Sequence, residues 1–124
     1  HAPHEQTSKN VEYNLASYGI SGFETALGLS LGLVHDGVLT LPRLLAKMTV
    51  NPARILNIPG GTMEPGSPGD IILFSMNAEW VVERKDFLSK GKNTPFQGRK
   101  LKGRNALTIV GGRIVYSDDR ILPV

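Results

Sequence analysis

The most regular pattern of apolar positions begins after Gly22 and ends near Asp36-Gly37. Apolar and small residues recur there at three- and four-residue spacing, as expected for a helix with one buried face: Phe23, Ala26, Leu27, Ser30, Leu31 and Val34. Asp36-Gly37 is a typical helix stop, because glycine tolerates the left-handed backbone that often follows the last turn. The pattern therefore predicts one helix of about four turns.

Two further helices are predicted directly after it. Thr40 is a suitable N-cap and Pro42 fits the first turn, and one face of this second helix carries Leu41, Leu44, Leu45 and Met48. Asn51-Pro52 predicts the start of a third, short helix that ends at Leu56, since a proline at the first helical position loses no hydrogen bond.

At Pro59-Gly60-Gly61 the pattern changes from helical to β. The following segment, 65–69, is a double turn of prolines and glycines. Beyond it, short apolar runs predict a buried strand and three more strands, at 70–74, 80–82, 106–110 and 113–116. Gly111-Gly112 joins the last two as a two-residue hairpin, because both glycines can take a positive φ.

Residues 1–20 show no sustained period and are predicted to form a long loop, which in a compact protein is usually functional. The chain thus divides into a helical part, 1–58, and a strand-rich part, 59–124. Each part has about sixty residues, too few to bury a stable core easily. Because the chain also starts with His1, we expect it to be a piece of something longer.

Composition excludes several classes of protein. Hydrophobic residues make up 40% and charged residues 20%, so the chain is neither a disordered polar tract nor a coiled coil. Its longest apolar stretch, 26–34, is far shorter than the roughly 20 residues of a membrane span. The absence of cysteine excludes disulfides, thiolate zinc sites and cysteine nucleophiles. A cytoplasmic location is the expectation that remains.

Positive charge is concentrated late in the chain. The segment from Arg84 to Arg104 contains eight basic residues and a single acidic one, Asp86. Its net charge is +7, compared with +3 for the whole chain. Such a segment could bind a phosphate backbone. Its only aromatic residues are Phe87 and Phe96, and a turn at Asn93-Thr94-Pro95-Phe96 interrupts it, so a solvated basic loop is the favoured interpretation.

The densest candidate chemistry is at the start of the chain, in His1-Ala2-Pro3-His4. Its two imidazoles could bind a metal, accept a proton or hold an anionic substrate. A closed zinc site usually needs four ligands, and only His35 is left to add to this pair. Any metal therefore needs ligands from elsewhere.

Several motifs resemble the C-terminal part of the dihydroorotases, which belong to the amidohydrolase superfamily. They occur in the same order along the whole chain: the His1–His4 run, Lys9, Glu12, 15–20, 22–26, Asn51-Pro52-Ala53, 65–70, 93–98 and 110–112. The later motifs also occur loosely in other amidohydrolases. His4 together with 16–19 separates dihydroorotases from the hydantoinase and allantoinase branches.

The resemblance implies an α/β fold: residues 1–58 would be the C-terminal end of a (β/α)8 TIM barrel, covering the end of strand 8 and the last helices. Residues 59–124 would be strands of a small β-sandwich domain. The implied reaction is the reversible, zinc-dependent cyclisation of N-carbamoyl-L-aspartate to dihydroorotate in de novo pyrimidine biosynthesis. Barrel enzymes carry their chemistry at the C-terminal ends of the strands, where the loop after His1 would lie.

The resemblance also implies roles for individual residues. His4 would contact the substrate carboxylate, and Tyr18 and Gly19 would close over the pyrimidine ring with main-chain polar groups. For Tyr18 simple packing is an equal alternative, and for Glu24 a structural role at a helix N-terminus is favoured. The family's catalytic aspartate would directly precede His1, and its metal ligands would lie further upstream, so no catalytic or metal-binding residue is expected in this chain. Ser17 stands where the family often has proline.

The expected partners are the substrate pair carbamoyl-aspartate and dihydroorotate, the remainder of the enzyme and a second copy of it, with aspartate carbamoyltransferase as a further candidate. No nucleic acid or membrane partner is expected. Three alternatives stay open. They are a non-catalytic amidohydrolase-like partner of a transferase, another cyclic amidohydrolase of the hydantoinase or allantoinase type, and a nucleic-acid module built on the segment from Arg84 to Arg104.

Overall fold

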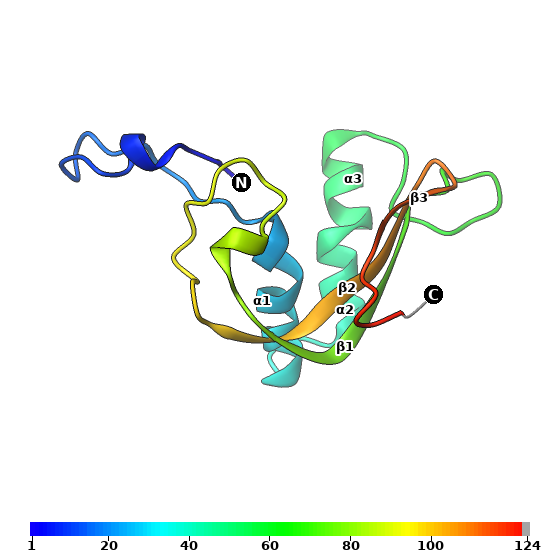
Figure 1. Cartoon of the computed structure of the whole chain (residues 1–124). Helices are drawn as coiled ribbons and strands as arrows, with labels where there is room; N and C mark the ends of the chain where they lie inside the picture. The colour runs from blue at the N-terminus through cyan, green and yellow to red at the C-terminus, as the bar shows by residue number, and fades with distance from the viewer. Residues whose placement is uncertain (123–124) are drawn as a thin grey trace.

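A computed structural model describes residues 1–122 as three helices followed by a three-stranded antiparallel sheet (Figure 1). The predicted change from helices to strands is therefore confirmed. No helix among the described residues is long and apolar enough to cross a membrane. The elements are η1 (Gln6–Ser8), α1 (Phe23–His35), α2 (Leu41–Met48), α3 (Val50–Leu56), β1 (Ile71–Val81), η2 (Arg84–Asp86), β2 (Lys100–Val110) and β3 (Arg113–Ser117).

The helices begin and end close to the predicted positions. Helix α1 ends at His35, and Gly37 has the positive φ, +71°, that was expected after it. Thr40 is the N-cap residue of α2, but its side chain makes no capping hydrogen bond. Helix α3 begins two residues earlier than predicted, at Val50 with Thr49 as N-cap, so Asn51-Pro52 lies inside the first turn and does not cap it.

Strand β1 replaces two strands that were predicted separately. The register against β2 shifts between Leu73 and Phe74 and again between Ser75 and Glu79, so the strand is continuous but bulged. At the second shift the Ser75 hydroxyl accepts hydrogen bonds from the backbone N–H groups of Asn77 and Ala78 (3.3 and 3.1 Å). The N–H groups of Asn77 and Ala78 therefore bond Ser75 and not β2, and residues 76–78 have no partner in the register with β2. The apolar pattern that predicted two separate strands is interrupted at the same place. The prediction that 70–74 is a buried strand is wrong for this chain: Leu73 is 49% exposed.

The hairpin between β2 and β3 is confirmed. Gly111 and Gly112 both have positive φ, +55° and +76°, as a turn of this kind requires. Strand β2 begins at Lys100, six residues before the predicted start. The first half of this strand was assigned to the basic loop because it belongs to the run of positive charge that ends at Arg104. The prediction of a loop is thus wrong for 100–104.

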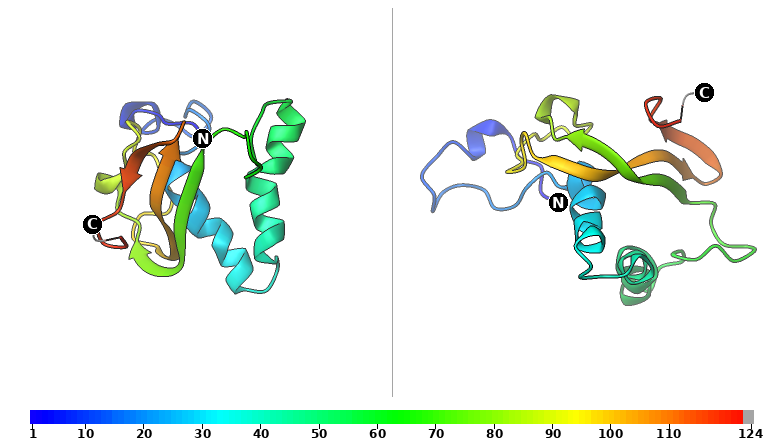
Figure 2. Two further views of the ribbon diagram at one scale, coloured as in Figure 1. Left: turned by 90° about the vertical axis from the view of Figure 1, so that its right-hand side faces the viewer. Right: turned by 90° about the horizontal axis from the view of Figure 1, so that it is seen from below.

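Helix α1 packs against the middle of β2, and the helix pair α2–α3 lies further from the sheet (Figure 2). Two glycines allow the close approach. A Cβ on Gly28 would lie 3.2 Å from the carbonyl oxygen of Gly103, and a Cβ on Gly103 would lie 2.4 Å from Cδ1 of Leu31. Leu31 is fully buried at this crossing. Further along the sheet, Val82, Phe87 and Leu101 form the core cluster.

We predict that Gly103→Ala destabilises the protein by about 1–3 kcal/mol, because the added methyl overpacks Leu31 and the residue has a φ of +108°. Gly32→Ala is the matched control: no atom would touch its Cβ, and alanine favours a helix interior over glycine. Urea unfolding measures both variants. Equal stability of Gly103→Ala and the wild type would contradict the packing described for α1 and β2.

Candidate functional site

The N-terminal segment forms a loop beside the start of α1, and the two arms of this loop, residues 1–4 and 18–22, lie side by side. Ala2 donates its backbone N–H to Ile20 O (2.7 Å), which lays the first residues alongside 18–22. His1 Nδ1 accepts hydrogen bonds from the backbone N–H groups of Gly22 and Phe23 (2.8 and 3.3 Å), and its ring stacks on Phe23 at 3.8 Å. His1 therefore caps α1, whose first N–H groups lack partners within the helix.

The three predicted substrate-binding residues lie together in this loop, where its two arms run side by side. The His4 Nε2–H donates to the carbonyl oxygen of Tyr18 at 2.6 Å. Gly19 has a φ of +94°, and a Cβ there would lie 2.4 Å from that of Ala2, so only glycine fits without strain. Tyr18 is 82% exposed and does not belong to the buried core of this chain.

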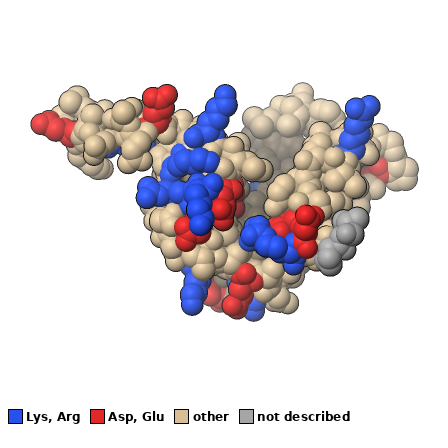
Figure 3. Space-filling view, in the orientation of Figure 1, with Lys and Arg blue, Asp and Glu red and all other residues tan. Residues whose placement is uncertain are grey.

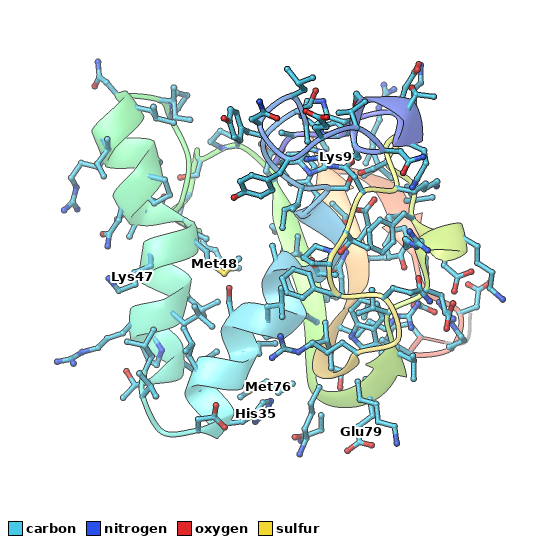
Figure 4. All side chains as sticks on the ribbon, turned by 90° about the vertical axis from the view of Figure 1, so that its left-hand side faces the viewer. Lys9, His35, Lys47, Met48, Met76 and Glu79 are labelled. Atoms are coloured by element: carbon cyan, nitrogen blue, oxygen red, sulfur yellow. The ribbon has the colours of Figure 1, made fainter. Side chains whose placement is uncertain are left out.

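Lys9 holds the same loop from the other side. Its ammonium group donates hydrogen bonds to the carbonyl oxygens of Ser17 and of Gly19, the latter at 2.7 Å. Figure 4 shows Lys9 within the N-terminal loop, above the sheet and away from helices α2 and α3. The sequence pointed to Lys9 only as part of the resemblance and indicated no contact for it.

Asn93 was not predicted as a site residue, yet it joins both arms of the loop. Its Oδ1 accepts the backbone N–H of His4 (2.8 Å), and its Nδ2 donates to Ala2 O (3.0 Å) and Gly19 O (3.3 Å). Its backbone carbonyl accepts the N–H of Ser21 (2.9 Å). The sequence indicated a turn here and a motif of the resemblance at 93–98, but no contact for Asn93, because its partners are 70 or more residues away along the chain.

Glu24 has a structural contact, as expected. Its Oε1 accepts the backbone N–H of Ser89 at 2.8 Å, which links α1 to the loop after η2. Burial raises the pKa of Glu24, but hydrogen bonds from the Ser89 side chain and backbone and the charge of Lys92 act in the other direction, and the net pKa is lowered. The carboxylate is therefore ionised at neutral pH and ties the first turn of α1 to this loop.

Comparison with known proteins shows the family to which the chain belongs. The model of the Amidohydrolase family matches residues 6–115. The chain belongs to the amidohydrolase family. It is 56% identical over 119 residues to a dihydroorotase of Syntrophus aciditrophicus, covering 96% of this chain and 28% of that protein. It is 53% identical over 116 residues to a dihydroorotase of Geobacter metallireducens, covering 94% and 27%. The resemblance to dihydroorotases is thus confirmed.

Solved structures place this amidohydrolase chain near the hydantoinases. The L-hydantoinase of Arthrobacter aurescens superposes with a TM-score of 0.77 at 32% identity, covering 82% of this chain and 23% of that one. A D-hydantoinase superposes with a TM-score of 0.80 at 22% identity, covering 90% and 25%, which shows a shared fold. The chain spans just over a quarter of the length of the curated relatives it matches.

The histidines of this amidohydrolase chain do not converge on a metal site. His1 caps α1, His4 bonds Tyr18, and His35 Nε2 lies 3.1 Å from the carbonyl oxygen of Met76 at the opposite end of α1 (Figure 4). Within residues 1–122, no three His, Cys, Asp or Glu side chains are grouped so that they could hold a metal ion. The residues present therefore do not form a zinc site by themselves.

Basic side chains on this amidohydrolase chain are interspersed with acidic ones. In Figure 3, Lys and Arg side chains lie close to Asp and Glu side chains on the face shown. Arg104 makes such a pair: its Nε lies 2.6 Å from Oδ2 of the buried Asp118, and its guanidinium lies over the ring of Trp80. Arg104 is thus a structural residue, which weakens the case for a nucleic-acid site on the basic segment.

An open cleft of about 1160 Å³ lies between α1, η2 and the sheet. Three of its lining residues each have a buried side-chain oxygen without a hydrogen-bond partner: Glu24 Oε2, Asn105 Oδ1 and Ser117 Oγ. Buried polar atoms of native proteins are nearly always paired. In native proteins the partner of such an atom is another protein group or an ordered water.

Proposed function

We propose that this chain is the C-terminal part of a dihydroorotase, which interconverts N-carbamoyl-L-aspartate and dihydroorotate in pyrimidine biosynthesis. Residues 1–58 would end a (β/α)8 barrel, and residues 59–124 would contribute strands to a small β-sandwich. The observation that carries the proposal is the 56% identity to a dihydroorotase over nearly the whole chain. The grouping of His4, Tyr18 and Gly19 in one loop supports it.

In this proposal His4 holds a carboxylate of the substrate. Its Nε2–H is committed to the Tyr18 carbonyl oxygen, so only Nδ1 is left for the ligand. In a neutral ring that nitrogen accepts hydrogen bonds, and a carboxylate offers no donor. His4 therefore binds as an imidazolium, with one N–H on Tyr18 and the other on the carboxylate, a charge-assisted pair.

Main-chain groups of Tyr18 and Gly19 would contact the flat ring. Among residues 1–122, no protein acceptor takes the backbone N–H of either residue, whereas the carbonyl oxygens of both are held by side chains of the loop. Two free N–H groups beside a glycine can approach a planar amide closely. The exposed Tyr18 ring can then cover the bound substrate and exclude water.

Zinc is the metal that the resemblance implies. It would polarise the amide carbonyl and activate a water molecule when bound. Because the histidines of this chain do not converge, the ligands must come from other segments of the complete enzyme. The part played by this chain is to bind and orient the substrate.

The surface of the chain supports packing against the remainder of the enzyme. Its solvent-accessible area is 8935 Å², whereas a compact protein of 13.5 kDa exposes about 6500 Å². Large apolar side chains are exposed on the sheet, among them Ile114 at 66% and Val115 at 59%. The cleft with its three unpaired oxygens lies on the same sheet. These surfaces would be covered in the complete enzyme. We also propose that the complete enzyme is a cytoplasmic homo-oligomer and that aspartate carbamoyltransferase is a candidate partner.

A substrate panel on the complete zinc-loaded enzyme tests the proposed function. We expect dihydroorotate to be hydrolysed, and carbamoyl-aspartate cyclised, with a kcat/KM at least a hundredfold above that for hydantoin or allantoin. A ratio of about a hundredfold corresponds roughly to the free energy lost when the charged group that binds the substrate carboxylate is left unpaired. A hydantoinase is the second candidate because the solved structure at 32% identity is one. Preferred turnover of hydantoin would favour it, and absence of any turnover would favour a non-catalytic partner.

A further inference from the structure

One side chain from the strand-rich part of the sequence reaches the substrate loop. Asn93 lies between η2 and β2, 89 residues from His4 and 74 from Gly19 along the chain. We propose that Asn93 is a positioning residue for substrate binding: its carboxamide fixes the backbone that carries His4 relative to the backbone that carries Gly19. This inference rests on the proposed function.

The contacts of Asn93 require a carboxamide. The backbone N–H of His4 needs an acceptor, which is Oδ1, and the carbonyl oxygens of Ala2 and Gly19 need a donor, which is Nδ2. These partners also fix which way the amide points, since the reverse orientation would oppose donor to donor and acceptor to acceptor. A carboxylate would supply only acceptors, and an aliphatic side chain neither.

The surroundings leave Asn93 little freedom. Gly91 is buried against Pro3, where a Cβ would lie 2.6 Å from the proline Cβ. The hydroxyl of the fully buried Ser21 lies 2.8 Å from both Gly91 O and Asn93 Oδ1, so its single proton serves one of them at a time. Residues 91–93 and the run from Pro3 to His4 are therefore packed as one unit.

The consequence for the site follows from the geometry of His4. Its backbone is held by Asn93, and its Nε2 is held by Tyr18, whose neighbour Gly19 is held by Asn93 as well. These contacts make a closed ring of interactions that orients the imidazole toward a ligand. Loss of the carboxamide would release the backbone at His4 and at Gly19, while the contact between the His4 imidazole and the Tyr18 carbonyl oxygen remained. The His4 imidazole and the free N–H groups of Tyr18 and Gly19 would then no longer be aligned for the same ligand.

A double-mutant cycle in the complete enzyme tests this role. We expect Asn93→Ala to lower kcat/KM for dihydroorotate about tenfold, mainly through KM, and to have less than a twofold effect when His4 is already alanine, because coupled residues are not additive. Asn93→Asp, of nearly the same shape, should do at least as much harm as alanine. Asn77→Ala, an exposed asparagine on β1, is the matched control and should match the wild type.

Two results would overturn the inference: full activity of Asn93→Asp, or equal effects of Asn93→Ala in the wild-type and His4→Ala backgrounds. Hydrogen exchange of residues 1–5 and 16–22 gives a readout independent of turnover, and we expect faster exchange in Asn93→Ala. If the wild-type enzyme did not act on dihydroorotate, the proposed function would fail. Faster exchange would then still support the fastening of the loop, and unchanged exchange would refute it.

Discussion

Replacing His4 by alanine in the complete enzyme is expected to raise the KM for carbamoyl-aspartate about ten- to a hundredfold. The substrate carboxylate would lose one charge-assisted hydrogen bond, a cost of about 1.5 to 3 kcal/mol. The zinc content should not change, because His4 bonds Tyr18 and lies in no group of metal-ligating side chains. Steady-state kinetics and elemental analysis of the same preparation measure both quantities.

His35→Ala is the control for this substitution. It also removes an imidazole that contacts a backbone carbonyl, that of Met76, but at the far end of α1, so the KM should stay at the wild-type value. Loss of zinc in His4→Ala would contradict the role assigned to His4 and make it a ligand. An unchanged KM would show that the carboxylate binds elsewhere.

The 124-residue chain by itself is expected to show no dihydroorotate turnover and no pair of tight zinc sites. Metal binding requires several ligands within bonding distance, and none of the described residues are grouped in this way. The exposed apolar side chains of β3 and the open cleft should also make the isolated chain self-associate or precipitate. In the complete enzyme, we expect other segments to supply the metal ligands and to cover these apolar surfaces.

Three measurements on the purified chain check this expectation, with the complete enzyme assayed in parallel. They are hydrolysis of dihydroorotate with added zinc, calorimetric titration with zinc, and sedimentation. Turnover close to that of the complete enzyme, or two tight sites per chain, would show that the chain contains the catalytic centre. A stable soluble monomer would argue against the proposed packing of the sheet against the remainder of the enzyme.

The helices and the final hairpin were predictable because their signals are local. Helix α1 is set by the spacing of its apolar residues and by Gly37, and the hairpin by two adjacent glycines. The bulge in β1 was not predictable, since it depends on the Ser75 hydroxyl and not on any apolar period. The first half of β2 was not predicted because its positive charge indicated a solvated loop. Arg104 in fact pairs with Asp118, a buried residue in the segment after β3.

The candidate site was predictable only in part. The sequence and its resemblance pointed to His4, Tyr18 and Gly19, which the structure brings together. Their substrate contacts stay a prediction. The contacts of Asn93 could not be found from local pattern, because its turn sequence carries no sign of partners that are 72 to 91 residues away. A side chain that joins distant backbone segments leaves no periodic trace in a sequence.

A chimera tests the central claim most directly. The matching 119-residue portion of the Syntrophus aciditrophicus dihydroorotase, 56% identical to this chain, would be replaced by the chain itself. If the chain is the substrate-orienting part of a dihydroorotase, the chimera hydrolyses dihydroorotate with a kcat/KM within about tenfold of the parent, a difference of about 1.4 kcal/mol. A chimera that folds and binds zinc like the parent but does not turn over dihydroorotate would contradict the account.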